Sequence, residues 1–141
     1  MLEIKLLGPH DLHMLNNVAD GVFDDPIVES SAGEFLGDPR HRLVLALEGS
    51  VVVGFVSAVI YLHPDKPSPE LWINEIGVAP VHQRQGIGKA LMQAILEEAK
   101  RSGCAEAWVL TDRSNLPAMS MYKSAGGEET LPDPTMFTFK L

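Results

Sequence analysis

Two glycines separated by one residue stand at the start of an amphipathic helix, directly after a strand. The stretch VHQRQGIGKALMQAILEEAK, residues 81 to 100, carries Gly86 and Gly88 and then apolar residues at helical spacing. The preceding LWINEIGVAP, residues 71 to 80, has the composition of a strand. A strand, a glycine loop and a helix in succession predict an α/β fold.

The rest of the chain also alternates between strand and helix patterns. In chain order we expect a strand from residue 3 to 7, a helix from 10 or 11 to 21, a short helix within 27–39, two hairpin strands within 42–62, the strand over 71–80, the helix that follows the glycines and ends by 103, a strand over 106–112, a short helix over 115–127 and a strand over 135–141. The order βααβββαβαβ predicts a mixed central sheet flanked by helices, in one domain spanning residues 1–141.

Composition limits the function classes. The chain has 141 residues, enough for one core without disulfides, and its 45% hydrophobic and 21% charged residues are typical of a folded protein. A net charge of −8 opposes binding to nucleic acid or anionic membranes and favours a cationic substrate, although an acidic surface can equally serve solubility alone. The lack of a long apolar run, of a signal peptide pattern and of a second cysteine beside Cys104 predicts a cytoplasmic protein.

The glycine loop predicts an anion site. N–H groups at a helix start lack intrahelical partners and carry the positive end of the helix dipole. Glycine at positions 86 and 88 removes the Cβ atoms that would keep a pyrophosphate away. The alternative is that the two glycines only make a tight connection between strand and helix. The donor side chains nearby are those of Gln83, Arg84, Gln85 and Lys89.

Two well-known phosphate loops do not fit. A Walker loop needs glycine at position 83 and serine or threonine at 90, but the chain has Gln83 and Ala90. A dinucleotide loop needs a third glycine where Leu91 stands. ATP and NAD are therefore poor candidates.

Gln83-Arg84-Gln85-Gly86-Ile87-Gly88 resembles the Q/R-x-x-G-x-G/A acyl-CoA loop of the GCN5-related N-acetyltransferases, the GNAT superfamily. A second stretch, with Asn115, Ala118, Tyr122 and Gly126, is similar to the N-x-x-A-x-x-x-Y-x-x-x-G signature of the same superfamily. The two signatures, in this order with a strand between them, cover roughly residues 71 to 127.

This resemblance implies the GNAT fold and acetyl-CoA as the acetyl donor, with no metal. It places the pantetheine arm against the backbone of Ile76, Gly77 and Val78, and the pyrophosphate on the amides of residues 84 to 89. By the same resemblance Gln83, Arg84, Gln85, Gly86, Ile87, Gly88, Lys89, Asn115 and Ala118 belong to the cofactor site. Asn115 either orients the cofactor or caps its helix.

Proton transfer needs further groups, because an alkyl amine with a pKa near about 10.4 is mostly protonated at neutral pH. Glu75 is the carboxylate of the strand beside the expected thioester; partial burial would make it a stronger base, acting directly or through water. The alternative is a structural carboxylate. The N–H of Val78 could bind the oxyanion. The resemblance makes Tyr122 the acid for the leaving thiolate, the alternative being an aromatic packed on the sheet.

Strand alternation puts Glu75 on one face with Leu71 and Ile73, and puts on the other face Trp72, Asn74 and Ile76.

Acceptor recognition falls to the front third and the loops. Phe23, Asp24 and Asp25 are the expected acceptor contacts, although the acidic pair before Pro26 also suits a plain turn. Scattered short stretches resemble small aminoglycoside 3-N-acetyltransferases of the superfamily, which implies a cationic amine such as an aminoglycoside or polyamine. Alternatives are a protein N-terminus, a lysine, a metabolite amine, or a binding module without turnover.

Three remaining features receive weaker assignments. His10 and His13 share a helix face but lack further ligands, so no metal site is expected. Cys104 is expected to be a small core residue. The segment 135–141, TMFTFKL, could supply an edge strand to a homodimer.

Overall fold

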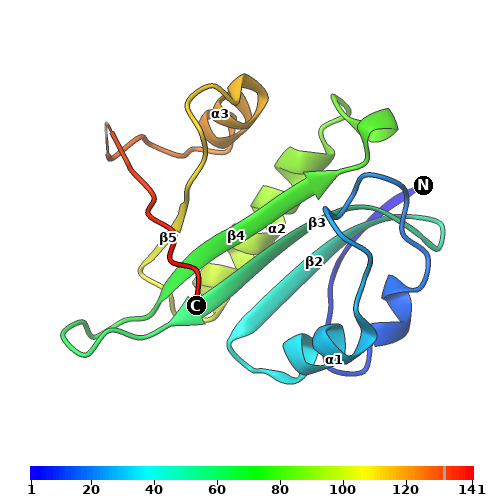
Figure 1. The fold of residues 1–141 in the computed structure, drawn as a ribbon, viewed down its shortest axis with the longest axis horizontal. Helices are drawn as coiled ribbons and strands as arrows, with labels where there is room; N and C mark the ends of the chain where they lie inside the picture. The colour runs from blue at the N-terminus through cyan, green and yellow to red at the C-terminus, as the bar shows by residue number, and fades with distance from the viewer. Residues whose placement is uncertain (132) are drawn as a thin grey trace.

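A five-stranded sheet in the order β1-β2-β3-β4-β5 forms the middle of the molecule in the computed structural model, which describes residues 1–131 and 133–141. Its strands are β1 (Leu2–Leu6), β2 (His41–Glu48), β3 (Val51–Tyr61), β4 (Glu70–Val78) and β5 (Glu106–Val109). Neighbours from β1 to β4 run antiparallel, and β5 lies parallel to β4 (Figure 1). The predicted α/β class with a mixed sheet is confirmed.

Helical elements cover both faces of this sheet. The long helix α2 (Ile87–Arg101) lies behind the sheet in Figure 1 and shares one buried cluster with it. The 3-10 helix η1 (Leu12–Leu15) and the helix α1 (Glu29–Gly37) lie in front and enclose a second buried cluster. A second 3-10 helix, η2 (Pro80–His82), precedes α2, and α3 (Leu116–Ser124) follows β5. Within residues 1–131 and 133–141, every helix is too short or too polar to cross a membrane.

A β-bulge in β4 shifts its side chains from one face to the other. Glu75 pairs with Ser57 of β3 and Ile73 pairs with the next residue, so Asn74 is the extra residue. Ile76 consequently packs in the cluster on the α2 side together with Leu71 and Ile73. The predicted alternation was therefore wrong beyond Ile73, and Glu75, next to Ile76 on an extended strand, lies on the front face.

The front third is less helical than its spacing predicts. The helix expected from residue 10 to 21 is wrong, since only one 3-10 turn forms there. Two hydrogen bonds explain the early end: Val52 N–H donates to the Asn17 carbonyl and Ala19 N–H donates to the Val52 carbonyl, both at 2.9 Å. These bonds join the chain to β3, which a continuing helix could not do. The short helix expected within 27–39 is confirmed as α1.

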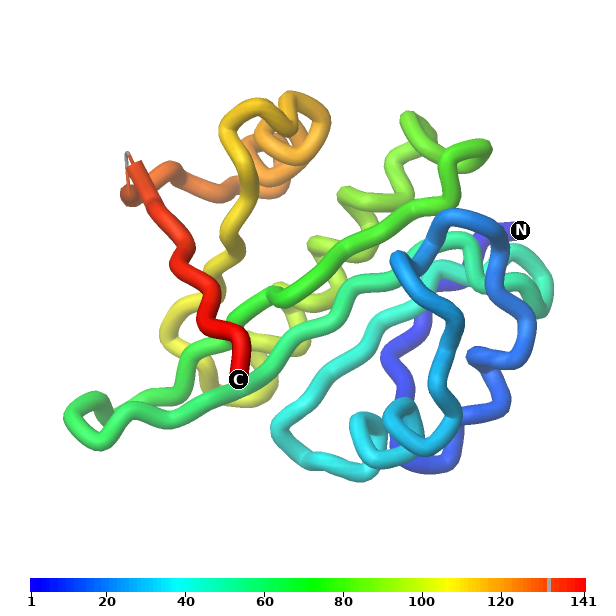
Figure 2. Tube along the Cα trace, viewed as in Figure 1, coloured from blue at the N-terminus to red at the C-terminus, as the bar shows by residue number. Residues whose placement is uncertain are grey.

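The C-terminal strand expected over 135–141 is also wrong. Figure 2 follows this segment away from α3 as an irregular trace, and residues 133–141 carry no strand. Alternating apolar residues form a strand only against a partner that covers them, and here Phe137 and Phe139 are 81% and 80% exposed. A homodimer through this segment stays a prediction.

The strand expected over 106–112 ends early, at Val109. The Asp112 carboxylate accepts hydrogen bonds from the N–H and the hydroxyl of Ser114, at 3.0 and 2.9 Å. This side chain competes with strand pairing and turns the chain toward α3.

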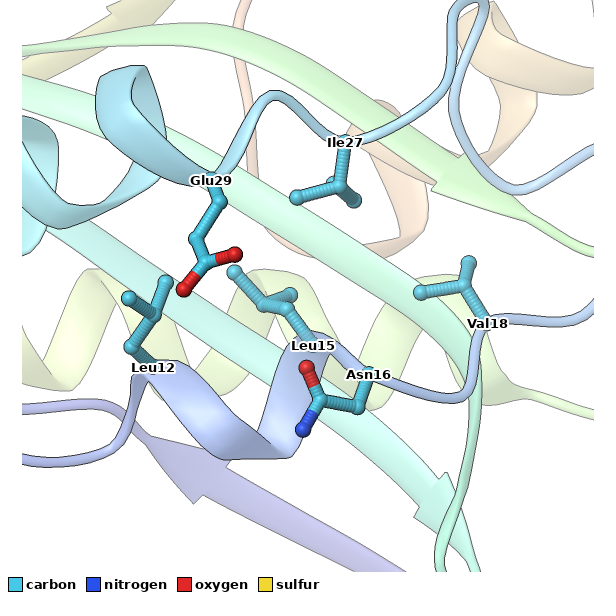
Figure 3. Close-up of a pocket in the computed structure, with 6 residues that line it drawn as sticks. All are labelled: Leu12, Leu15, Asn16, Val18, Ile27 and Glu29. Carbon is cyan, nitrogen blue, oxygen red and sulfur yellow. The ribbon is translucent and has the colours of Figure 1, made fainter.

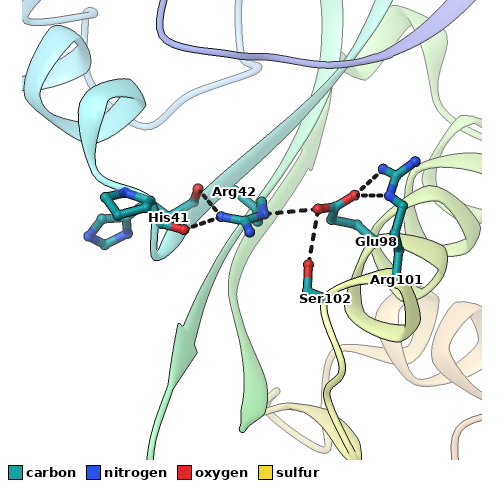
Figure 4. A network of polar contacts seen from close by, with 6 residues as sticks. His41, Arg42, Glu98, Arg101 and Ser102 are labelled. Atoms are coloured by element: carbon teal, nitrogen blue, oxygen red, sulfur yellow. Dashed lines mark hydrogen bonds and ion pairs between the residues drawn. The ribbon is translucent and has the colours of Figure 1, made fainter.

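A buried carboxylate ties the end of α2 to β2 (Figure 4). Glu98 is 7% exposed and accepts hydrogen bonds from Arg42 Nε at 3.0 Å, Arg101 Nε at 3.0 Å and Ser102 Oγ at 3.1 Å. Burial alone would raise the pKa of Glu98, but the bonds from Arg101, Arg42 and Ser102 outweigh it and hold that pKa below the ordinary value. The charged form is thus the one that stabilises the fold.

We expect Glu98→Gln to lower the free energy of unfolding at pH 7 by about 2 kcal/mol, because Arg42 loses its charged partner. Since folding lowers the pKa of Glu98, its contribution is present above the ordinary pKa of 4.5 and is lost as the pH falls through the folded value. Urea unfolding at pH 7 and at pH 3.5 measures both effects, and the gap between wild type and variant should narrow at the lower pH. Glu97→Gln, at an exposed neighbour on α2, is the control and should change stability little.

Candidate active site

One edge of β4 loses its partner halfway along the strand. The parallel pairing with β5 joins Glu70–Ile73 to Glu106–Val109, whereas β4 continues to Val78. Ala79 N–H donates to the Val53 carbonyl of β3 at 2.8 Å. Because backbone groups alternate along a strand, those of Val78 and Ile76 point to the other edge, away from β3. That open edge can pair with the extended backbone of a ligand, as an added strand would.

Gln83 holds the end of this edge. Its side-chain amide donates a hydrogen bond to the Val78 carbonyl at 3.1 Å. The resemblance assigns Gln83 to the cofactor site; in this structure its side chain fixes the loop against β4, and its role toward the cofactor stays a prediction. The N–H of Val78 is left to face the open edge.

The loop after Gln83 has an unusual backbone. Arg84 and Gly86 have φ angles of 63° and 80°, in the left-handed region. Gly86 caps α2 without any side-chain hydrogen bond, and the first helical bond runs from Ala90 N–H to the Gly86 carbonyl at 3.0 Å. The N–H groups before Ala90 therefore lack intrahelical partners and are free to bind an anion.

The two glycines of the loop act in different ways. A Cβ added at Gly86 would meet nothing within 4 Å, so the protein needs glycine there for its positive φ. A Cβ at Gly88 would make ordinary contacts, 3.7 Å from Met121 Cε of α3, so Gly88 marks where α3 approaches the start of α2. Ile87 is 3% exposed and anchors the helix start, which leaves only its backbone for a ligand. Arg84, Gln85 and Lys89 are exposed beside it.

On the front face, the segment before Phe23 crosses β4 at Gly77. A Cβ at Gly77 would collide with the Val22 carbonyl oxygen and would lie 2.8 Å from Phe55 Cε1. Only glycine permits this approach, as expected for a strand glycine near another backbone. Phe23 then stacks on Phe55, with ring centroids 4.0 Å apart. Neither Val22 nor Phe55 was predicted from the sequence, because the pairing of Phe55 with Gly77 joins two strands and is decided by the tertiary structure.

This crossing brings the predicted acceptor residues to the predicted catalytic strand. Asp24 and Asp25 follow the stacked Phe23 directly and are exposed. Glu75 lies two residues before Gly77 on the same face and is exposed as well. The partial burial that the sequence argument attached to Glu75 is therefore not present in the protein alone. Shielding from water would have to come from the bound substrates.

The helix α3 carries Asn115 at its N-cap and Tyr122 in its last turn. Asn115 Oδ1 accepts a hydrogen bond from Ala118 N–H at 3.2 Å, so Asn115 caps α3. Tyr122 is half-buried and packs against the core cluster on the α2 side. Burial raises the pKa of Tyr122, which keeps its hydroxyl protonated at neutral pH and able to donate a proton.

A separate hollow opens on the front face, away from the residues that the sequence singled out. It has a volume of about 370 Å³ and lies between η1 and the start of α1, where Leu12 and Glu29 point toward one another (Figure 3). Its lining residues are Leu12, Leu15, Asn16, Val18, Ile27 and Glu29. It carries a single carboxylate and none of the proton-transfer candidates.

The structure also bears on the other titratable side chains: possible metal ligands, the thiol of Cys104 and the carboxylate of Glu70. Among residues 1–131 and 133–141, no three histidine, cysteine, aspartate or glutamate side chains are arranged to hold a metal ion. Burial raises the pKa of the Cys104 thiol, which opposes a reactive thiolate. Glu70 is not open to an acceptor, because Lys66 and Tyr61 each hydrogen-bond to it at 3.2 Å.

Comparisons with known proteins agree with this geometry. The acetyltransferase (GNAT) family matches residues 12–126. The [ribosomal protein bS18]-alanine N-acetyltransferase of Escherichia coli K12 is 37% identical over 129 residues, which are 92% of this chain and 82% of that protein. N-alpha-acetyltransferase RimI of Mycobacterium tuberculosis is 34% identical over 105 residues, 74% of this chain and 63% of that protein.

Solved structures share the fold at lower identity. An aminoglycoside acetyltransferase from an uncultured soil metagenomic sample, in complex with sisomicin, superposes with a TM-score of 0.81 at 23% identity and covers 99% of this chain and 96% of its own. An aminoglycoside N-acetyltransferase of the AAC(6')-Iy type, in complex with CoA, gives 0.75 at 23% identity, with 99% and 95% coverage.

We expect Gly86→Ala to weaken CoA binding by at least about tenfold, because alanine disfavours the positive φ that aligns the loop N–H groups. Gly103→Ala is the matched control: Gly103 follows α2, has a φ of +81° and likewise has open space around its Cβ position. Both variants should lose about 1 kcal/mol of stability. Calorimetric titration with CoA should separate them, and an equal loss of affinity in both would contradict the assignment of this loop.

Proposed function

Because the chain belongs to the acetyltransferase (GNAT) family, we propose that it transfers the acetyl group of acetyl-CoA to a primary amine of a small cationic acceptor, such as an aminoglycoside or a polyamine. The coarser part of this statement, acetyl-CoA-dependent N-acetylation of an amine, follows from the family and from relatives that are named N-acetyltransferases. The class of acceptor is the proposal.

One observation carries the choice of acceptor. The backbone of Val22 contacts Gly77 of β4, the strand that would hold the thioester. The exposed pair Asp24 and Asp25 follows this contact by two and three residues along the chain. Two carboxylates on an exposed turn attract protonated amines, and the net charge of −8 adds to that attraction. A neutral or anionic acceptor would gain nothing from either feature.

In the proposed reaction the donor lies along the open edge of β4, with its pyrophosphate on the loop N–H groups before Ala90. Glu75 takes a proton from the acceptor ammonium, directly or through water, and the free amine attacks the thioester carbonyl. The N–H of Val78, which faces the open edge, donates a hydrogen bond to the oxyanion. When the carbon–sulfur bond breaks, Tyr122 protonates the departing thiolate, and the tyrosinate so formed takes back the remaining proton of the acylated nitrogen, directly or through water, which leaves a neutral amide.

A second acceptor class is supported by a specific finding. The relative from Escherichia coli, 37% identical over 92% of this chain, is named for acetylation of an alanine of a ribosomal protein. A protein N-terminus is also a primary amine and would use the same donor site. A binding module without turnover is disfavoured, because the sequence retains both the carboxylate Glu75 and the tyrosine Tyr122.

We expect Glu75→Gln to lower kcat by about 10²-fold or more while leaving the KM for acetyl-CoA nearly unchanged, since the side chain moves a proton and does not bind the donor. Tyr122→Phe should lower kcat by a smaller factor. Release of free CoA thiol measures both rates. If the double variant transferred acetyl groups as fast as the wild type, neither residue would be catalytic.

We expect Asp24→Asn together with Asp25→Asn to raise the KM for cationic acceptors by about tenfold, and less so at high salt, because two attractive charges are removed. Glu3→Gln together with Glu97→Gln is the control, because it removes the same amount of charge at a distance from the site. Glu3 lies on β1, the edge strand farthest from β5, and Glu97 lies on α2, which covers the other face of the sheet. The panel of acceptors should comprise aminoglycosides, polyamines, free lysine and a peptide with an N-terminal alanine. Efficient turnover of the peptide alone would reject the small-acceptor proposal and favour the second class.

A further inference from the structure

Two tryptophans stack on the front face of the sheet, outside the site described so far. Trp72 of β4 pairs in register with Trp108 of β5, and their rings lie 5.1 Å apart with an interplanar angle of 10°. Leu71 and Ile73, the neighbours of Trp72, pack toward α2, so Trp72 points to the front. Trp72 therefore lies on the same face of the sheet as Glu75.

The inner ring of this stack is held rigidly. Trp108 Nε1 donates a hydrogen bond to Tyr61 Oη at 2.6 Å, and the Tyr61 hydroxyl donates to Glu70 at 3.2 Å. Lys66 Nζ also lies 3.2 Å from Glu70. Burial raises the pKa of Tyr61, which keeps this hydroxyl a donor. The polar groups of the cluster are thus engaged with one another, and Trp108 has little freedom to turn.

The outer ring is left open. Trp72 is 39% exposed, unusual for so large an apolar side chain. Its register neighbour on the β3 side is Val59, whose side chain is much shorter than an indole. One face of Trp72 rests on Trp108, and the exposed fraction shows that part of the ring is open to solvent. Phe137 and Phe139 of the C-terminal segment do not cover it, as both are at least 80% exposed.

The position of Trp72 along β4 matches the path of an acceptor. The anion-binding loop follows the C-terminal end of β4, so the donor approaches Glu75 from that end. An acceptor bound in front of Glu75 can then extend toward the N-terminal half of β4 as well as toward Asp24 and Asp25. Because of the bulge, Trp72 and Glu75 pair with Val59 and Ser57, which are two residues apart on β3, so the span along the sheet is about 7 Å at roughly 3.3 Å per residue.

We propose that Trp72, supported by Trp108, binds a second positive charge of the acceptor, about 7 Å or more from the amine that is acetylated. The inference rests on the proposed cationic acceptor and specifies it as a molecule with two ammonium groups at that spacing. An ammonium ion over an indole face is held by the negative face of the ring, and the fixed stack means that no side chain has to be ordered on binding.

The test compares two acceptors of equal length, 1,8-diaminooctane and octylamine, which differ in the second ammonium group. We expect Trp72→Leu to raise the KM for the diamine about fivefold to tenfold, and to leave unchanged kcat, the KM for acetyl-CoA and the KM for octylamine. Trp72→Phe should keep most of the diamine affinity. Leu62→Ala, which removes an exposed side chain from the loop between β3 and β4, is the control.

A direct binding measurement separates this inference from the proposed function. The chain has only these two tryptophans, so the diamine should quench their fluorescence in the presence of CoA, and Trp72→Leu should remove most of the response. Quenching without any turnover would contradict the proposed function and leave the inference standing. Turnover of both amines with KM values that Trp72→Leu does not change would overturn the inference and leave the proposed function. An equal rise for diamine and octylamine would also overturn it, because the contact would then be apolar.

Discussion

The separation of β5 from β4 after Ile73 is the constraint on which the site depends. Unpaired backbone N–H and C=O groups along a strand need partners, and a folded protein normally supplies them with another strand or with water. Here β4 runs on to Val78 while β5 ends at Val109, and the chain turns toward α3 at Asp112. The open stretch can therefore pair with an amide-containing ligand.

The bulge at Asn74 lies at the same level as this divergence and decides which side each group serves. Without the extra residue, Glu75 would point into the apolar cluster beneath α2, where an unpaired carboxylate would be costly. With it, Ile76 and Val78 fill that cluster and Glu75 stands on the front face. The sheet thus separates α2, whose N-terminus provides the proposed anion site, from the front segment around Phe23.

The donor half and the acceptor half of the proposed site differ in how strongly the fold determines the positions of their groups. The donor half consists of backbone groups: the edge of β4 and the start of α2. Such groups are set by the fold itself, which fits the sharing of this fold by structures at 23% identity. The proposed acceptor half consists of exposed side chains, such as Asp24, Asp25 and Trp72, which can change without disturbing the core. Relatives named for a ribosomal protein and fold neighbours named for aminoglycosides are consistent with this division.

The sequence by itself determined the α/β class, the strand, glycine loop and α2 in succession, and the donor chemistry. These depend on local features: apolar spacing, the positive φ that Gly86 allows, and two signatures whose residues lie close together in the chain. Only the tertiary structure decided the rest. The hydrogen bonds of Asn17 and Ala19 to Val52 shortened the first helix, and the bulge opposite Ser57 moved Glu75 to the front. The approach of Val22 to Gly77 and the stacking of Trp72 on Trp108 join residues distant in the chain, and single-strand periodicity carries no information about such pairings.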